Sequence, residues 1–192
     1  MKNSKQKKSI CVFCGSKYGN NAIYKDATLE LGEQLAKNEI KLIYGGGSLG
    51  LMGELSKSVH RNKGEVLGVI PKNLLKIEGI NKNHGEIIIT DDMHKRKKTM
   101  YENADAFLCL PGGIGTLEEV SETITWFQLN INRKPIFFLN INGYWNNFRV
   151  LLEQFVSLEF SDQDLLNYFI FFESVETLMP SLLSSLDIPS KE

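Results

Sequence analysis

The 192-residue sequence has few cysteines, few prolines and no excess of either charge, and each shortage excludes a class of protein. Three cysteines, at positions 11, 14 and 109, do not make a disulfide framework. The chain has only 5 prolines, and 42% of its residues are hydrophobic. This composition excludes collagen-like and low-complexity chains. The 22 basic and 23 acidic residues leave a formal net charge of -1, so no overall field favours nucleic acid. Any anionic ligand must be bound by local groups.

Long hydrophobic runs are also missing. The longest, residues 107–111 and 135–139, are far shorter than the ~18–20 residues that span a bilayer, so we expect no membrane partner. The apolar segment after the basic N-terminus is too short for a signal peptide. We therefore expect a flexible basic tail over residues 1–9, one domain over residues 10–187, a C-terminal tail over residues 188–192, and a cytoplasmic location.

Apolar runs alternate with helical patterns along the whole chain. Strands are predicted over residues 10–13, 42–44, 66–70, 87–90, 106–110, 136–139 and, more weakly, 168–172. The runs are continuously apolar, as in strands that are covered on both faces. The pattern predicts a single-domain α/β fold, a Rossmann-like doubly wound parallel sheet with helices on both faces. Residues 72–85 form the longest irregular stretch, which we interpret as a surface loop beside the site.

Glycines follow three of the predicted strands, each before a helical pattern. Helix N-termini and backbone N–H groups at one sheet edge favour an anion, although glycines also make plain tight turns. The spacing Gly45, Gly47 and Gly50 matches a dinucleotide motif, but the acidic residue at the end of the next strand is missing. No Walker A lysine follows either. The candidate phosphate loops contain Gly15, Ser16, Gly45, Gly46, Gly47 and Met52, and later Gly112, Gly113 and Gly115.

A basic run, residues 95–98, follows the fourth predicted strand. Asp91 or Asp92 is the expected N-cap, which places four cations near the positive end of a helix. Each exposed cation there costs ~0.3–1 kcal/mol, and a broken local rule often marks a functional site. We expect Arg96 and Lys97 to meet an anionic substrate, and Lys95 and Lys98 to face solvent.

Glu119 has two interpretations. With Thr116 it fits the capping box Ser/Thr-x-x-Glu, in which the carboxylate returns to the N-cap amide. A carboxylate one turn into a phosphate-binding helix is also well placed to face a sugar attached to that phosphate. Cys11 and Cys14 have redox spacing, but in a strand they point to opposite faces and are expected to be buried structural thiols. No ligand cluster indicates a metal, and no cofactor is expected.

The segment from Pro111 to Glu119, Pro-Gly-Gly-Ile-Gly-Thr-Leu-Glu-Glu, resembles the signature of the LONELY GUY (LOG) family of cytokinin riboside 5′-monophosphate phosphoribohydrolases. Other segments resemble the family in the same order, over about residues 10–155. The resemblance implies hydrolysis of the N-glycosidic bond of a nucleoside 5′-monophosphate, with Arg96 and Glu119 as the catalytic pair. The substrate-binding residues that it implies are Glu78, Arg96, Lys97, Gly112, Gly113, Ile114, Gly115, Thr116, Leu117, Glu118, Glu119 and Thr125.

The resemblance also implies a homodimer or higher homo-oligomer, for which a helix carrying Val120, Ile124, Trp126 and Phe127 is a candidate surface, although core packing explains these residues almost as well. Lys95 stands where relatives often have Glu or Gln. The family is often labelled lysine decarboxylase, but no pyridoxal phosphate site is indicated. A general AMP or purine and pyrimidine nucleotide nucleosidase and a non-catalytic nucleotide carrier are the alternatives, and base specificity stays open.

Overall fold

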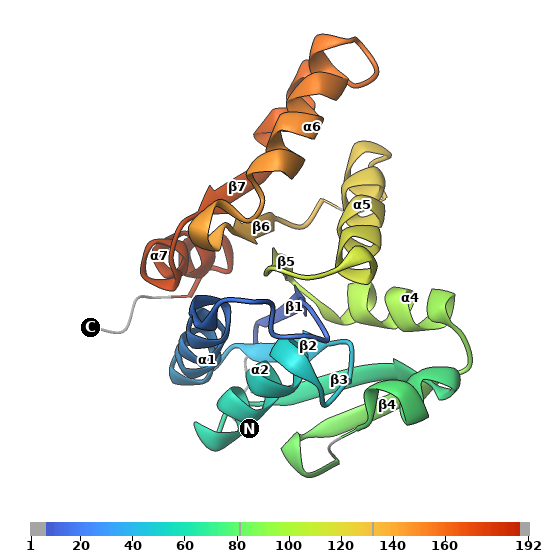
Figure 1. Cartoon of the computed structure of the whole chain (residues 1–192), viewed down its shortest axis with the longest axis vertical. Helices are drawn as coiled ribbons and strands as arrows, with labels where there is room; N and C mark the ends of the chain where they lie inside the picture. Colours follow the sequence, from blue (N-terminus) through green and yellow to red (C-terminus); the bar gives the residue numbers. More distant parts are fainter. Residues whose placement is uncertain (1–6, 81, 132, 189–192) are drawn as a thin grey trace, which may run out of the picture.

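The computed structural model describes residues 7–80, 82–131 and 133–188, in which seven strands form one sheet (Figure 1). The strands are β1 (Ser9–Phe13), β2 (Lys41–Tyr44), β3 (Val66–Pro71), β4 (Glu86–Thr90), β5 (Ala106–Cys109), β6 (Ile136–Leu139) and β7 (Phe169–Phe172). Their order is β4-β3-β2-β1-β5-β6-β7, and every pair is parallel. The predicted doubly wound parallel sheet is confirmed.

Helices cover both faces of the sheet. One core contains residues of α1 (Ala22–Lys37), α2 (Gly50–Arg61) and α7 (Val175–Ser185). The other contains residues of α4 (Met93–Asn103), α5 (Ile114–Gln128) and α6 (Asn146–Ser157). Successive strand residues alternate between the cores, which is why the strands are apolar throughout. Cys11 and Cys14 accordingly lie in opposite cores, buried and free as predicted.

The strand order reverses between β1 and β5. From β1 the chain passes through α1 to β2 on one side, and from β5 it passes through α5 to β6 on the other. The segments that leave the carboxyl ends of these two adjacent strands therefore separate. In open α/β sheets, a crevice at this switch point is where ligands bind.

Helix α6 extends away from the sheet, as Figure 1 shows. Its exposed apolar side chains, and those just after it, are Val150, Leu151, Phe155, Leu158 and Phe160. The α5 residues that the sequence offered as a contact surface are instead packed inward. Val120 and Ile124 are buried, and Trp126 and Phe127 are partly buried against the same core. Packing within the chain therefore explains the apolar character of these four α5 residues.

Three segments differ from the sequence-based expectation. The expected basic tail is shorter than residues 1–9, because Ser9 is the first residue of β1 and its N–H donates to Asp105. Residues 1–6 and 189–192 lie outside the described residues, while Ile188 packs on the core. The stretch 72–85 contains the 3-10 helices Lys72–Leu74 and Lys82–His84 and the short α3 (Leu75–Glu78).

Two further 3-10 helices, Ile141–Gly143 and Gln163–Asn167, flank α6. The first of them brings the chain back over the carboxyl end of the sheet before α6 begins, and it lies against α1. Within the described part of the chain, every helix is too short or too polar to cross a bilayer.

Candidate active site

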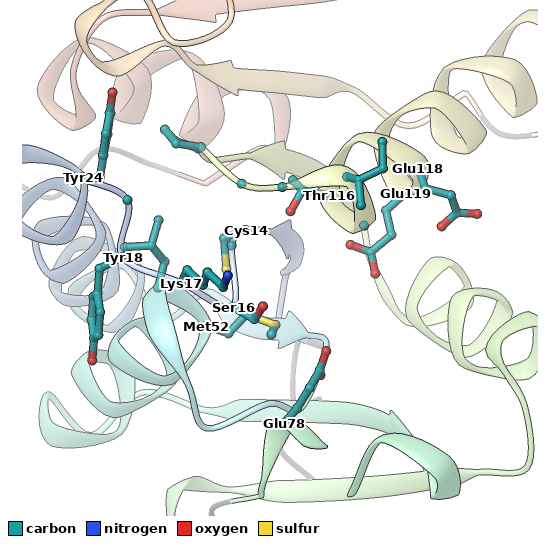
Figure 2. A pocket seen from close by; sticks show the side chains of 18 of the residues that line it. Cys14, Ser16, Lys17, Tyr18, Tyr24, Met52, Glu78, Thr116, Glu118 and Glu119 are labelled. Carbon is teal, nitrogen blue, oxygen red and sulfur yellow. The ribbon is translucent and has the colours of Figure 1, made fainter. Parts of the chain in front are cut away.

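A cavity of about 470 Å³ opens at the carboxyl ends of the strands, in the crevice between β1 and β5. We call Glu78, Arg96, Glu118 and Glu119 its charged wall, Lys17, Tyr18, Tyr24 and Tyr144 its aromatic wall, and residues 111–116 its glycine loop. Figure 2 shows Tyr18, Tyr24 and Lys17 on one side of the cavity and the two α5 carboxylates on the other. Thr116 of the glycine loop lies between them (Figure 2).

A buried ion pair is the centre of the charged wall. Arg96 Nη1 lies 3.2 Å from Glu119 Oε1, and the two side chains are only 7% and 10% exposed. The Arg96 Nε donates to the Val69 carbonyl at 3.1 Å, and Nη2 donates to the Gly45 carbonyl at 3.3 Å. A Cβ on Gly45 would lie 2.0 Å from Nη2, so a side chain there would displace the guanidinium. The α4 arginine is thus fixed by two strands and a carboxylate.

Burial raises the pKa of Glu119 to about 7, although the nearby Arg96 cation opposes the shift. Near neutral pH the carboxyl therefore exchanges readily between its two protonation states. A carboxylate with such a pKa is suited to proton transfer at physiological pH.

Helix α5 presents its N-terminus to the cavity. Its N-cap is Gly113, in extended conformation, and no side chain caps the helix. The predicted capping box is therefore wrong: Thr116 lies inside the first turn, and Glu119 is paired with Arg96 instead. Leu117 N–H bonds back to the Gly113 carbonyl, so the N–H groups of the preceding turn have no acceptor within the helix. These groups and the helix dipole favour an anion at this point.

The four residues of the basic run, residues 95–98, differ in their exposure to solvent, and Lys95 and Lys98 are the exposed ones, as the sequence predicted. Asp92 caps α4, its side chain accepting from Lys95 N–H at 2.8 Å. Lys95 and Lys98 are exposed, while Arg96 and Lys97 are buried. Lys97 does not line the cavity, however, because its Nζ lies against the Glu118 and Glu122 carboxylates of α5. Of the two buried cations, only Arg96 reaches the cavity.

Most, but not all, of the other predicted residues meet in the cavity. Those that line it are Glu78, Gly112, Gly113, Ile114, Gly115, Thr116, Glu118, Glu119, Gly15, Ser16 and Met52. Leu117 and Thr125 do not line it, and Thr125 is exposed further along α5. Gly45, Gly46 and Gly47 do not line the cavity, because they lie behind the side chains of Arg96, Met52 and Glu78 or are packed on β3.

Glu78 adds a buried acceptor to the charged wall. Its Oε2 has no hydrogen-bond partner within the described part of the chain, and burial raises its pKa. Figure 2 shows the side chain reaching from α3 toward the middle of the cavity. An unsatisfied buried acceptor is costly unless a ligand group donates to it. No group of three metal-ligating side chains occurs among residues 7–80, 82–131 and 133–188.

The sequence missed most of the aromatic wall. Tyr144 donates from its hydroxyl to the Gly112 carbonyl, and its ring meets that of Tyr24 edge to face at 5.9 Å. Tyr18 contacts Glu54 at 3.4 Å through its hydroxyl. The other unpredicted lining residues are Cys14, Lys17, Gly19, Leu51, Met93 and Pro111. Only Lys17 and Tyr18 had a sequence signal, since they directly follow the first glycine loop.

The base of the aromatic wall rests on α2. Gly50, the first residue of α2, has a φ of +57°, and a Cβ there would lie 2.2 Å from the Ser16 carbonyl carbon. Glycine therefore allows the segment that carries Lys17 and Tyr18 to lie directly on the helix.

Residues 52–182 match the family model described as "Possible lysine decarboxylase". The chain is 46% identical over 175 residues to the probable cytokinin riboside 5′-monophosphate phosphoribohydrolase LOG4 of Oryza sativa subsp. japonica, covering 91% of this chain and 76% of the rice protein. It is 50% identical over 149 residues to the cytokinin riboside 5′-monophosphate phosphoribohydrolase LOG7 of Arabidopsis thaliana, covering 78% and 69%.

The molybdenum cofactor carrier protein of Chlamydomonas reinhardtii has the same fold, with a TM-score of 0.70, 22% identity and coverage of 95% of this chain and 99% of that one. With the signature of the glycine loop in place at the switch point and relatives this similar over most of its length, the chain belongs to the LOG family.

Proposed function

We propose that this chain is an N-glycosyl hydrolase that cleaves nucleoside 5′-monophosphates, among them cytokinin riboside monophosphates, into the free base and ribose 5-phosphate. The observation that carries the proposal is the buried Arg96–Glu119 pair beside an uncapped helix N-terminus in one cavity. The names of the rice and Arabidopsis relatives support the same reaction.

The 5′-phosphate is assigned to the N-terminus of α5. The N–H groups of residues 114–116 and the helix dipole attract it, and glycines at 113 and 115 leave open space in front of the backbone. Lys17 reaches into the cavity from the opposite side, with Ser16 beside it (Figure 2). With the phosphate at this position, the sugar is assigned to the space next to Glu119, one turn further along α5.

Glu119 acts on the sugar carbon that carries the base. The bond between C1′ and the base nitrogen breaks with its electron pair on the base, and the ribose becomes oxocarbenium-like. The Glu119 carboxylate stabilises this positive charge, orients a water molecule and accepts its proton as the oxygen bonds to C1′. Glu119 then passes this proton, through solvent, to the departing base, which regenerates the carboxylate and gives the neutral free base.

Arg96 and Glu78 hold the reacting groups. The Arg96 guanidinium favours the ionised form of Glu119 and is itself fixed by the Val69 and Gly45 carbonyls, so little reorganisation is needed during the reaction. The unpaired Oε2 of Glu78 accepts a hydrogen bond from a sugar hydroxyl or a base amino group.

The decisive experiment is incubation with AMP and chromatographic detection of adenine. We expect adenine and ribose 5-phosphate in equal amounts, and a kcat/KM for adenosine lower by roughly 10²-fold, since adenosine lacks the phosphate that positions the sugar. Comparison of AMP with its N6-isopentenyl derivative separates a cytokinin-directed enzyme from a general AMP nucleosidase. Tight AMP binding without release of adenine would instead indicate a nucleotide carrier.

We further propose that the chain forms a homodimer through α6, which extends away from the sheet (Figure 1) and carries exposed apolar side chains. Phe160, just after α6, and Val150, within it, are the most exposed of them, at 82% and 59%, and their burial by a second copy is favourable. Light scattering is expected to give a dimer for the wild type and a monomer for Phe160→Glu. The control Gln154→Glu, at an exposed polar position of α6, leaves the dimer intact. A monomeric wild type at micromolar concentration contradicts this proposal.

A further inference from the structure

Lys97 and Arg96 are neighbours on α4 with different surroundings. Arg96 points into the cavity, whereas Lys97 is 7% exposed and has its Nζ 2.5 Å from Glu118 Oε1 and 3.0 Å from Glu122 Oε1. Glu118 and Glu122 are four residues apart and so lie on one side of α5. A single ammonium group therefore joins α4 to two successive turns of α5.

A second contact between the two helices lies close by. The Tyr101 hydroxyl, one turn further along α4, lies 3.3 Å from the Glu119 carbonyl and 2.7 Å from the Thr123 hydroxyl. Glu119 and Thr123 are again four residues apart on α5. The two contacts together restrain both the rotation of α5 and its sliding along α4. The Arg96–Glu119 pair connects the same two helices, next to these contacts.

Lys97 is held by two α5 carboxylates and does not line the cavity, so its side chain is directed at α5 rather than at a ligand in the cavity. We propose that Lys97 is a positioning residue that fixes α5 against α4, so that the Glu119 carboxylate meets both Arg96 and the sugar in reactive geometry.

This inference rests on the proposed hydrolase function and predicts a particular kinetic pattern. A small displacement of a catalytic group lowers the rate of the chemical step for every substrate, whereas the loss of a phosphate ligand affects only substrates that carry the phosphate. Lys97→Met keeps the length and the apolar part of the side chain and removes the charge. We expect its kcat to fall by about 10-fold or more with AMP and by the same factor with adenosine.

Two further variants complete the experiment. Lys97→Arg keeps a cation within reach of both glutamates and is expected to restore most of the kcat. Lys98→Met removes the neighbouring exposed cation, whose Nζ lies 3.7 Å from Glu102, and is expected to behave as the wild type. All assays are done well below the melting temperature of each variant, so that a loss of stability alone does not reduce kcat.

A fall in activity of Lys97→Met confined to AMP, with adenosine hydrolysis unchanged, would show that Lys97 is a phosphate ligand and overturn the inference. An unchanged kcat with both substrates overturns it as well. If the wild type hydrolyses neither substrate, the hydrolase proposal is wrong, and this result does not decide the role of Lys97. The inference about Lys97 is then decided by a crystal structure of Lys97→Met, in which retention of the 3.2 Å Arg96–Glu119 contact contradicts it.

Discussion

The charged wall and the aromatic wall of the cavity are built in opposite ways. The central pair of the charged wall comes from two long helices, is almost inaccessible to solvent, and is held by several bonds. The aromatic wall comes largely from connecting segments, and Tyr18 and Tyr144 are 46% and 40% exposed. Rigid helices suit groups that must keep one geometry, and exposed loop side chains can adjust to different ligands. We infer that the chemistry belongs to the charged wall and the choice of substrate to the aromatic wall.

Glu119→Gln gives the largest expected effect on the charged wall. Gln keeps the shape of the side chain but carries no negative charge for the oxocarbenium-like sugar, so kcat is expected to fall on the order of 10²-fold or more. The measurement is adenine release from AMP.

Thermal unfolding provides the control for this variant. Folding raises the pKa of Glu119 above its ordinary value, so ionisation costs the folded state, and the wild type loses stability as the pH rises through about 7. A neutral glutamine does not bear this cost but leaves the buried Arg96 without its charged partner, so at pH 8 the melting temperature of the variant is expected to stay close to that of the wild type. Normal turnover in this folded variant would remove the distinction between the two walls.

The pH dependence of the wild type is the next largest effect. With the Glu119 carboxylate as the active form, kcat/KM is expected to fall as the pH drops through about 7, by close to tenfold for each further unit. The pKa that this profile reports is that of Glu119 in the presence of the charges of Arg96, Lys97, Glu118 and Glu78, which all contribute to it. A rate that is constant from pH 8 to pH 5 would mean that ionised Glu119 is not required.

On the aromatic wall, Tyr144→Phe removes a hydroxyl that donates to the Gly112 carbonyl of the glycine loop. A hydrogen bond of this kind contributes about 0.5–1.5 kcal/mol, which corresponds to a rise in the KM for AMP of roughly 2- to 10-fold. We expect kcat to stay within about twofold, because the Arg96–Glu119 pair is not touched. A large fall in kcat with unchanged KM would place Tyr144 with the chemistry rather than with binding.

Lys95→Ala is expected to have the smallest effect, because Lys95 belongs to neither wall. It is exposed and pairs with Asp91 at 2.6 Å, and surface pairs of this kind contribute little. The kcat/KM for AMP should change by less than about twofold. A larger change specific to one base would show that this position influences substrate choice from outside the cavity.

The fold was largely predictable because buried strands and amphipathic helices follow from local patterns. All seven strands of the sheet begin and end within about two residues of the predicted ranges. The site was predictable in part. The unfavourable place of Arg96 and Lys97 near a helix N-terminus predicted that both meet an anionic substrate. Successive helical residues point in different directions, however, and the sequence does not say which of the two faces the cavity.

Two features, the start of α5 and the contact between Tyr24 and Tyr144, could not be predicted from local sequence patterns. The capping box failed because α5 begins at Ile114 after an extended Gly113, so a matching motif fell inside the helix. Tyr24 and Tyr144 meet only because the segments after β1 and β6 return to the same edge of the sheet. Such a contact depends on the complete topology, which no short segment contains.

Gly50 determines how closely the segment that carries Lys17 and Tyr18 packs on α2. Because its missing side chain lets the Ser16–Lys17 segment rest on α2, one added methyl group would overlap that backbone and displace the segment that carries Lys17 and Tyr18. A substitution at Gly50 is therefore a way to change the shape of the cavity from a residue that does not line it.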